Sequence, residues 1–90
     1  MIEVKKEDEN KFSVNLKEGF VSKDYEVTVD DDYYENLTCK NISKEELVKN
    51  SIKFLLERES KDSILSSFDL KDIPNYFPDY EKVIKERSMK

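Results

Sequence analysis

The sequence predicts an α+β fold, in which a three-stranded antiparallel sheet is followed by helices packed on one face, in β-β-β-α-α-α order and two layers. In the first third, apolar and polar residues alternate, which is typical of strands that pack on a core from one side. Later, apolar residues recur at helical spacing behind residues that commonly cap helices. We expect one domain, 1–90, with a polar tail over 85–90 that frays.

Three segments carry the alternation of the predicted sheet. In the first, Ile2 and Val4 share one face and Glu3 lies on the other. The second and third segments carry three apolar residues each: Phe12, Val14 and Leu16, then Tyr25, Val27 and Val29. We expect these side chains to form the face of the sheet that packs on the helices.

Two turns join these strands, the first over residues 7–10 and the second in the loop after Lys17. Gly19, the only glycine, lies in the second loop, where turns often require a positive φ. Phe20 and Val21 in that loop do not fit the alternation. We expect them either to cover the end of the sheet or to face a partner.

Residues 24–37 contain six acids and no base: Asp24, Glu26, Asp30, Asp31, Asp32 and Glu35. Such a patch repels phosphate backbones and favours basic partners. The alternative interpretation is that these acids belong to a solvated turn and the start of a helix. Asp30 to Asp32 are N-cap candidates for a short helical turn. A cation site is a further reading of these acids, but the calcium-loop spacing and its glycine are missing.

A well-specified helix is predicted over 44–59. Ser43 and Glu46 have the spacing of a capping box, and Ile42 and Leu47 that of a hydrophobic staple. Its apolar residues spread over roughly 200° of the helix surface, beyond the usual stripe. We therefore expect cover on two sides, by the sheet and by the C-terminal segment, a partner chain or both.

Short helical segments are predicted after residue 59. Their candidate caps are Ser60 or Asp62, then Asp69 or Asp72, then Asp79. The first would carry Ile64, Leu65 and Phe68. Pro74 favours Asp72 as the second cap, because proline is tolerated only near a helix start.

The composition argues against an enzyme and against a cofactor or metal centre. The sequence contains no histidine and one glycine, so it lacks the commonest general base and a phosphate-cradling loop. Its one cysteine, Cys39, is either a reactive thiol beside Lys40 or a small structural residue. Residues 1–20 lack a signal-peptide pattern, and no apolar run is long enough for a membrane span, so we expect a cytoplasmic protein without membrane contact.

Two resemblances bear on the fold. The stretch YEVTVDDDYYENLTCKNISKEELVKNSIKFLLERE resembles the ribbon-helix-helix fold and the C-terminal part of HicB-like antitoxins. In that family the strand pairs with its twin in a dimer and reads DNA, which implies that Glu26 and Thr28 would be the readers. Nearly the whole chain, with EELVKNSIKFLLERE and the ending SILSSFDLKDIPNYFPDYE, looks like a group of small uncharacterised prokaryotic proteins. That resemblance leaves function open.

Together these observations predict a non-catalytic, intracellular protein-interaction module that forms a homodimer and offers an acidic surface to a basic partner. Its candidate partner-binding residues are Asp24, Glu26, Asp30, Asp31, Asp32, Glu35, Phe20 and Val21. The alternative is an antitoxin-like or transcription-regulatory DNA-binding protein. We do not expect nucleic-acid binding, because the aromatic residues fall on apolar faces or beside acids.

Overall fold

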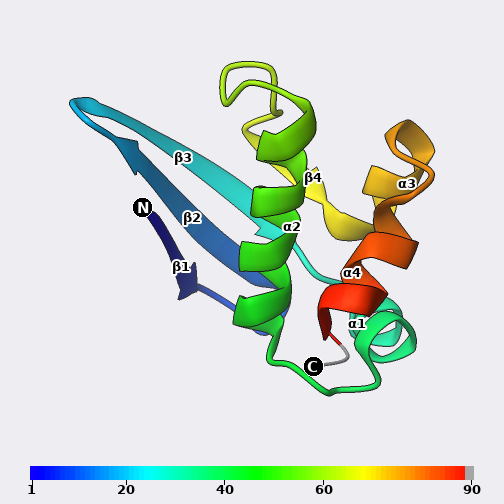
Figure 1. Ribbon diagram of the computed structural model, residues 1–90. Helices are drawn as coiled ribbons and strands as arrows, with labels where there is room; N and C mark the ends of the chain where they lie inside the picture. The colour runs from blue at the N-terminus through cyan, green and yellow to red at the C-terminus, as the bar shows by residue number, and fades with distance from the viewer. Residues whose placement is uncertain (89–90) are drawn as a thin grey trace.

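The computed structural model describes residues 1–88, and Figure 1 shows a sheet packed against helices. Within these residues, the strands and helices are β1 (Ile2–Lys6), β2 (Lys11–Glu18), β3 (Val21–Thr28), α1 (Asp31–Thr38), α2 (Lys44–Arg58), β4 (Ser67–Asp69), the 3-10 helix η1 (Leu70–Asp72), α3 (Ile73–Tyr76) and α4 (Tyr80–Ser88). The α+β class and the alternating strands are therefore confirmed.

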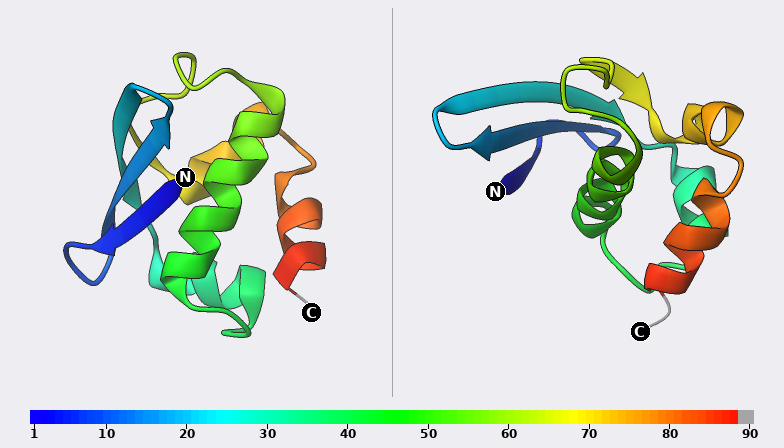
Figure 2. Two further views of the ribbon diagram at one scale, coloured as in Figure 1. Left: turned by 60° about the vertical axis from the view of Figure 1, so that its left-hand side comes forward. Right: turned by 45° about the horizontal axis from the view of Figure 1, so that its top comes forward.

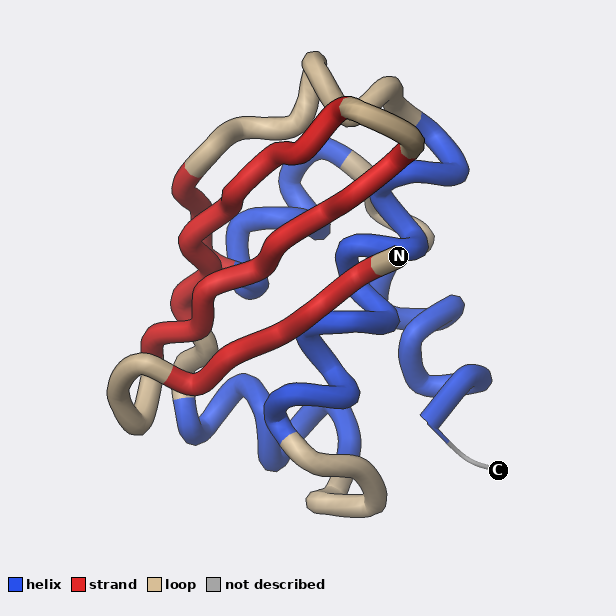
Figure 3. The backbone as a smooth tube through the Cα atoms, turned by 90° about the vertical axis from the view of Figure 1, so that its left-hand side faces the viewer, coloured by secondary structure: helices blue, strands red, loops and turns tan. Residues whose placement is uncertain are grey.

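The sheet has four strands in the order β1-β2-β3-β4. Figure 3 shows the strands, in red, side by side with the helices, in blue, packed against them. The first three pair antiparallel, whereas β4 is parallel to β3. The prediction of a three-stranded antiparallel sheet was therefore wrong, because a fourth, parallel strand is present. The described residues also form four α helices where three were predicted. β4 is too short to show alternation in the sequence. Its position depends on pairing with the distant strand β3, and Glu26 N donates to Ser66 O at 2.7 Å beside it.

The chain between α2 and β4 forms a turn, so the helix predicted from Ser60 or Asp62 was wrong. The sheet holds this turn from two points. Tyr25 Oη donates to the Lys61 carbonyl at 2.7 Å, and Lys23 Nζ lies 2.9 Å from the Asp62 carboxylate. These contacts are distant in sequence, which is why local helix signals failed to predict the turn.

Helix α2 packs between the sheet and the C-terminal segment (Figure 2). Its buried residues are Leu47, Val48, Ser51, Ile52, Phe54 and Leu55. On the side away from the sheet, the Phe54 ring makes edge contacts with Phe77 and Tyr80, at centroid distances of 5.9 and 5.2 Å. The expected cover on two sides of α2 is thus present within one chain.

The caps of the first two helices agree with the predictions. Ser43 accepts a hydrogen bond from Glu46 N at 3.1 Å, and Asp30 accepts one from Tyr33 N at 3.0 Å. Further along, Asp69 caps η1 by accepting from Lys71 N, and Asp72 precedes α3 without a side-chain cap bond. α4 continues to Ser88, so 85–88 are helical, and the rest of the tail predicted to fray lies outside the described residues.

The turn between β2 and β3 contains Gly19 at φ +58°, as predicted. Phe20 beside it is fully exposed, and Val21 is 48% exposed. Phe20 therefore does not cover the end of the sheet, which leaves contact with a partner as the remaining expectation for this side chain.

Helix α1 ends in two consecutive residues with positive φ, Cys39 at 53° and Lys40 at 60°. Side chains crowd the backbone in this left-handed conformation, which glycine adopts freely. We expect Cys39→Gly to raise the free energy of unfolding by about 0.5–1 kcal/mol in urea denaturation. The control Asn36→Gly, inside α1, should instead lower it by about 0.3 kcal/mol, the difference between the helix propensities of the two residues. A Cys39→Gly protein less stable than the wild type would contradict the prediction.

A buried hydroxyl pair joins α2 to α4. Ser51 donates its single proton to the Leu47 carbonyl at 2.7 Å, so the 2.6 Å contact between Ser51 Oγ and Tyr80 Oη is donated by Tyr80. Both residues are fully buried. The pair therefore satisfies hydroxyls that water cannot reach.

Ser51→Ala is expected to lower the free energy of unfolding by about 1–3 kcal/mol, because the buried Tyr80 hydroxyl loses its acceptor. Tyr80→Phe should lower it by about 1 kcal/mol, since Ser51 keeps its bond to Leu47. The double variant should lose less than the sum of the two singles. Urea denaturation of all four proteins measures this coupling, and strictly additive losses would argue against it.

Candidate functional site

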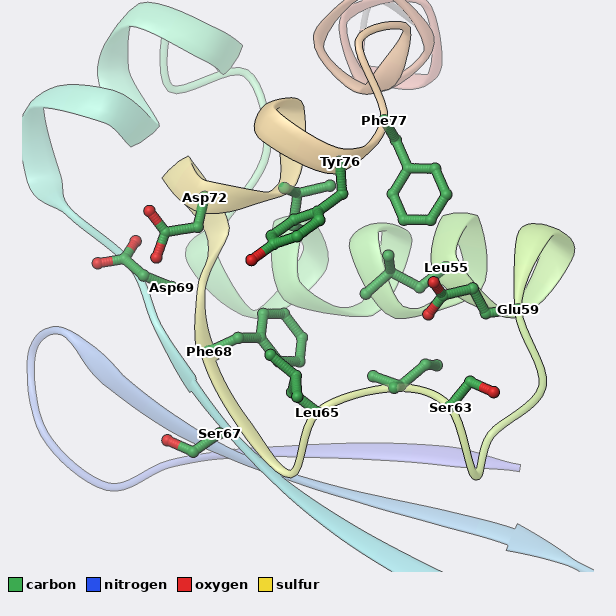
Figure 4. Close-up of a pocket in the computed structure, with 12 residues that line it drawn as sticks. Leu55, Glu59, Ser63, Leu65, Ser67, Phe68, Asp69, Asp72, Tyr76 and Phe77 are labelled. Carbon is green, nitrogen blue, oxygen red and sulfur yellow. The ribbon is translucent and has the colours of Figure 1, made fainter.

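An apolar groove lies where the end of α2, the segment before β4, β4 itself and α3 meet (Figure 4). Its volume is about 370 Å³. The apolar side chains that line it include Leu55, Leu65, Phe68, Ile73, Tyr76 and Phe77. The groove forms because the turn after α2 and the short α3 leave space between them above β4.

Two of the groove's apolar side chains are exposed, Leu65 at 63% and Tyr76 at 71%. Within residues 1–88, large apolar side chains are exposed at five positions in all, the other three being Met1, Phe20 and Val21. Single exposed apolar residues are ordinary, whereas an apolar hollow bordered by two of them is typical of binding surfaces.

The charged residues around the groove are all acidic. Glu59 lies at one end in Figure 4, and Asp69 and Asp72 lie at the other. Asp69 already accepts a bond from Lys71 N, but the carboxylates of Glu59 and Asp72 have no hydrogen bond or ion pair with residues 1–88. Within residues 1–88, no lysine or arginine lines the groove. This arrangement suits an apolar group that is flanked by positive charge.

Most acids of the predicted partner-binding set are engaged inside the molecule. Asp30 caps α1, Glu35 pairs with Lys40 at 2.8 Å, and Asp24 accepts from the Asn15 amide at 2.7 Å. Asp31 pairs with Lys44, whose hydrogen bond lowers the pKa of that carboxyl below its usual range. These four carboxylates have structural partners that compete with any external one.

The remaining predicted residues do not form a single surface. Glu26 and Asp32 are exposed, and no side-chain partner is found for either within residues 1–88. Phe20 and Val21 lie at the opposite end of β3 from α1. The structure therefore separates the hairpin pair from the acids at α1.

The groove was not predicted from the sequence. Leu65 was predicted to lie on the apolar face of a short helix, and it instead lies in an irregular segment. The one usable signal was a set of acids close to apolar residues: Asp69 and Asp72 were interpreted only as candidate helix caps, and Glu59 only as the end of a helix.

Other readings of the sequence find limited support. Within residues 1–88, no three His, Cys, Asp or Glu residues come together in a way that could hold a metal ion. β2 pairs along one edge of β3, and β4 pairs with residues 26–28 on the other edge, so the part of the strand that contains Glu26 and Thr28 has no free edge for the dimer pairing implied by the ribbon-helix-helix resemblance. No helix in the described part of the chain has the length and apolar character to cross a membrane.

The comparisons with known proteins found no relative of this chain. Neither a family model, nor a curated protein, nor a solved structure matches the chain.

Proposed function

We propose that the protein is a non-catalytic, intracellular protein-interaction module that binds an apolar side chain of a partner in the groove. Basic residues of the partner would flank that side chain. The observation that carries the proposal is the apolar groove between the exposed Leu65 and Tyr76, whose charged lining residues, within residues 1–88, are all acidic.

The size and chemistry of the groove indicate how such a partner would bind. A volume of about 370 Å³ holds one or two large side chains and no whole helix face. Glu59 and the Asp69–Asp72 pair lie at opposite ends, so Lys or Arg on either side of an apolar anchor would meet a carboxylate (Figure 4). Binding of this kind is small in area and transient.

Selection of phage-displayed random peptides on the protein tests the proposal. We expect enriched peptides to carry Phe, Trp or Leu beside Lys or Arg, and their affinity to fall as salt is added. Leu65→Asp should abolish their binding, because it places a charge at the apolar edge of the groove.

Asn36→Asp is the matched control, since it adds the same charge to exposed α1, away from the groove. It should bind the selected peptides as the wild type does. Peptides that bind Leu65→Asp and the wild type equally would contradict the proposal.

A further inference from the structure

We infer that the groove's occupant is the β2–β3 hairpin tip of a second copy of this chain, with Phe20 inserted between Leu65 and Tyr76. The inference rests on the proposed function, because it names the partner of the same groove. It joins the fully exposed side chain of Phe20 to the apolar groove.

The hairpin tip is built to present an apolar side chain. Gly19 at φ +58° makes the tight turn, and Phe20 follows it with its whole side chain in water. Two contacts hold the flanks of the tip against the turn after α2: Lys61 Nζ lies 3.4 Å from Glu18 Oε2, and Lys23 Nζ lies 2.9 Å from Asp62 Oδ1. A side chain presented by a held turn loses little conformational entropy on binding.

The charges of the tip complement the groove. Glu18 and Lys23 are paired within the chain, whereas the exposed ammonium of Lys17 has no side-chain partner within residues 1–88. The free charge of the tip is therefore positive, and the free carboxylates of the groove are those of Glu59 and Asp72. A second copy thus supplies both the apolar anchor and the flanking cation.

The tip cannot fill the groove of its own chain. The turn between β2 and β3 lies at one end of the sheet, and α3 lies on the other side of α2 (Figure 1). Each copy therefore carries one tip and one groove at separate places. Such an interface is head-to-tail, and it extends to a third copy unless the assembly closes into a ring.

Sedimentation velocity on the full chain and two variants tests this arrangement. The wild type should associate as its concentration rises toward about 1 mM, the range expected for a small interface. Phe20→Ser, which removes the tip, and Leu65→Asp, which blocks the groove, should each stay monomeric. Their equimolar mixture should form a dimer and nothing larger, because it contains one working tip and one working groove per pair.

A wild type that stays monomeric throughout this range, or a mixture of the two variants that stays monomeric where the wild type associates, would overturn the inference. If basic peptides still bind the groove in either case, the proposed function stands and only the identity of the partner is wrong. Both substituted residues are exposed, so circular dichroism should show folded variants.

The charge contribution has its own test in the same measurement. Lys17→Glu should weaken wild-type association up to about fivefold, because it turns an attraction to the groove's acids into a repulsion. Lys49→Glu makes the same charge change on the exposed face of α2 and should have no such effect.

Discussion

Replacement of Phe54 by alanine is expected to lower the free energy of unfolding by about 3–5 kcal/mol. The ring is fully buried, contacts Phe77 and Tyr80 at their edges, and lies 3.7 Å from the Arg58 guanidinium carbon. Removing it leaves a cavity where α2 meets the C-terminal segment. Urea denaturation followed by circular dichroism measures the loss.

Two further variants test this expectation. Phe54→Leu fills part of the cavity and should lose less stability than alanine. Tyr76→Ala also removes an aromatic ring, but that ring is 71% exposed, so the change should stay within about 0.5 kcal/mol. Equal losses for Phe54→Ala and Tyr76→Ala would contradict the assigned core.

The strands β2 and β3 were predictable because one face is buried and the other is solvated. Phe12, Val14 and Val27 are all fully buried, at the alternate positions that the sequence indicated. β4 was not predictable in this way. Its three residues are too few for a pattern, and the pairing of Ser67 with Glu26 spans a long stretch of sequence.

The cover of α2 was predictable only in outline. Its wide apolar surface indicated two covering layers, but the sequence left open whether the second belonged to a partner chain. The buried Tyr80 and Ile84 of α4 fill that place, so the width of the α2 surface no longer argues for a dimer. The features that support association are Phe20 and the groove.

The site could not be predicted from the sequence for a related reason. A groove depends on the spaces between elements, and Leu65 is exposed in an irregular segment where a helix was predicted. The acids of 24–37 were easy to find, yet Asp30 and Asp31 act as a helix cap and an ion-pair partner. Asp30 therefore has the helix-capping role that the sequence indicated.

Above about pH 10, where tyrosines of an unfolded chain ionise, the protein is expected to lose stability steeply. Burial raises the pKa of Tyr80 well above its ordinary value. Burial likewise raises the pKa of Tyr33, aided by the hydrogen bond from its hydroxyl to Glu81, and burial also raises that of Tyr25.

Stability falls with rising pH because the folded protein then holds more protons than the unfolded chain. As pH rises past the unfolded pKa, the unfolded chain loses its tyrosine protons while the folded protein keeps them, so the free energy of unfolding falls. The stabilising contribution is complete below about pH 10 and is lost as pH rises toward the folded pKa. Tyr80 alone contributes about 1.4 kcal/mol per pH unit in this range.

Urea midpoints measured across this pH range, with tyrosinate absorbance of the folded protein, test the expectation. Tyr80→Phe should make the free energy of unfolding fall less steeply with pH, by the contribution of one proton. Phe54→Leu, which is destabilised but keeps every tyrosine, should preserve the wild-type slope. If both variants kept the wild-type slope, Tyr80 would have to ionise equally in both states. That outcome would conflict with its burial between α2 and α4 and with the hydrogen bond that it donates to Ser51.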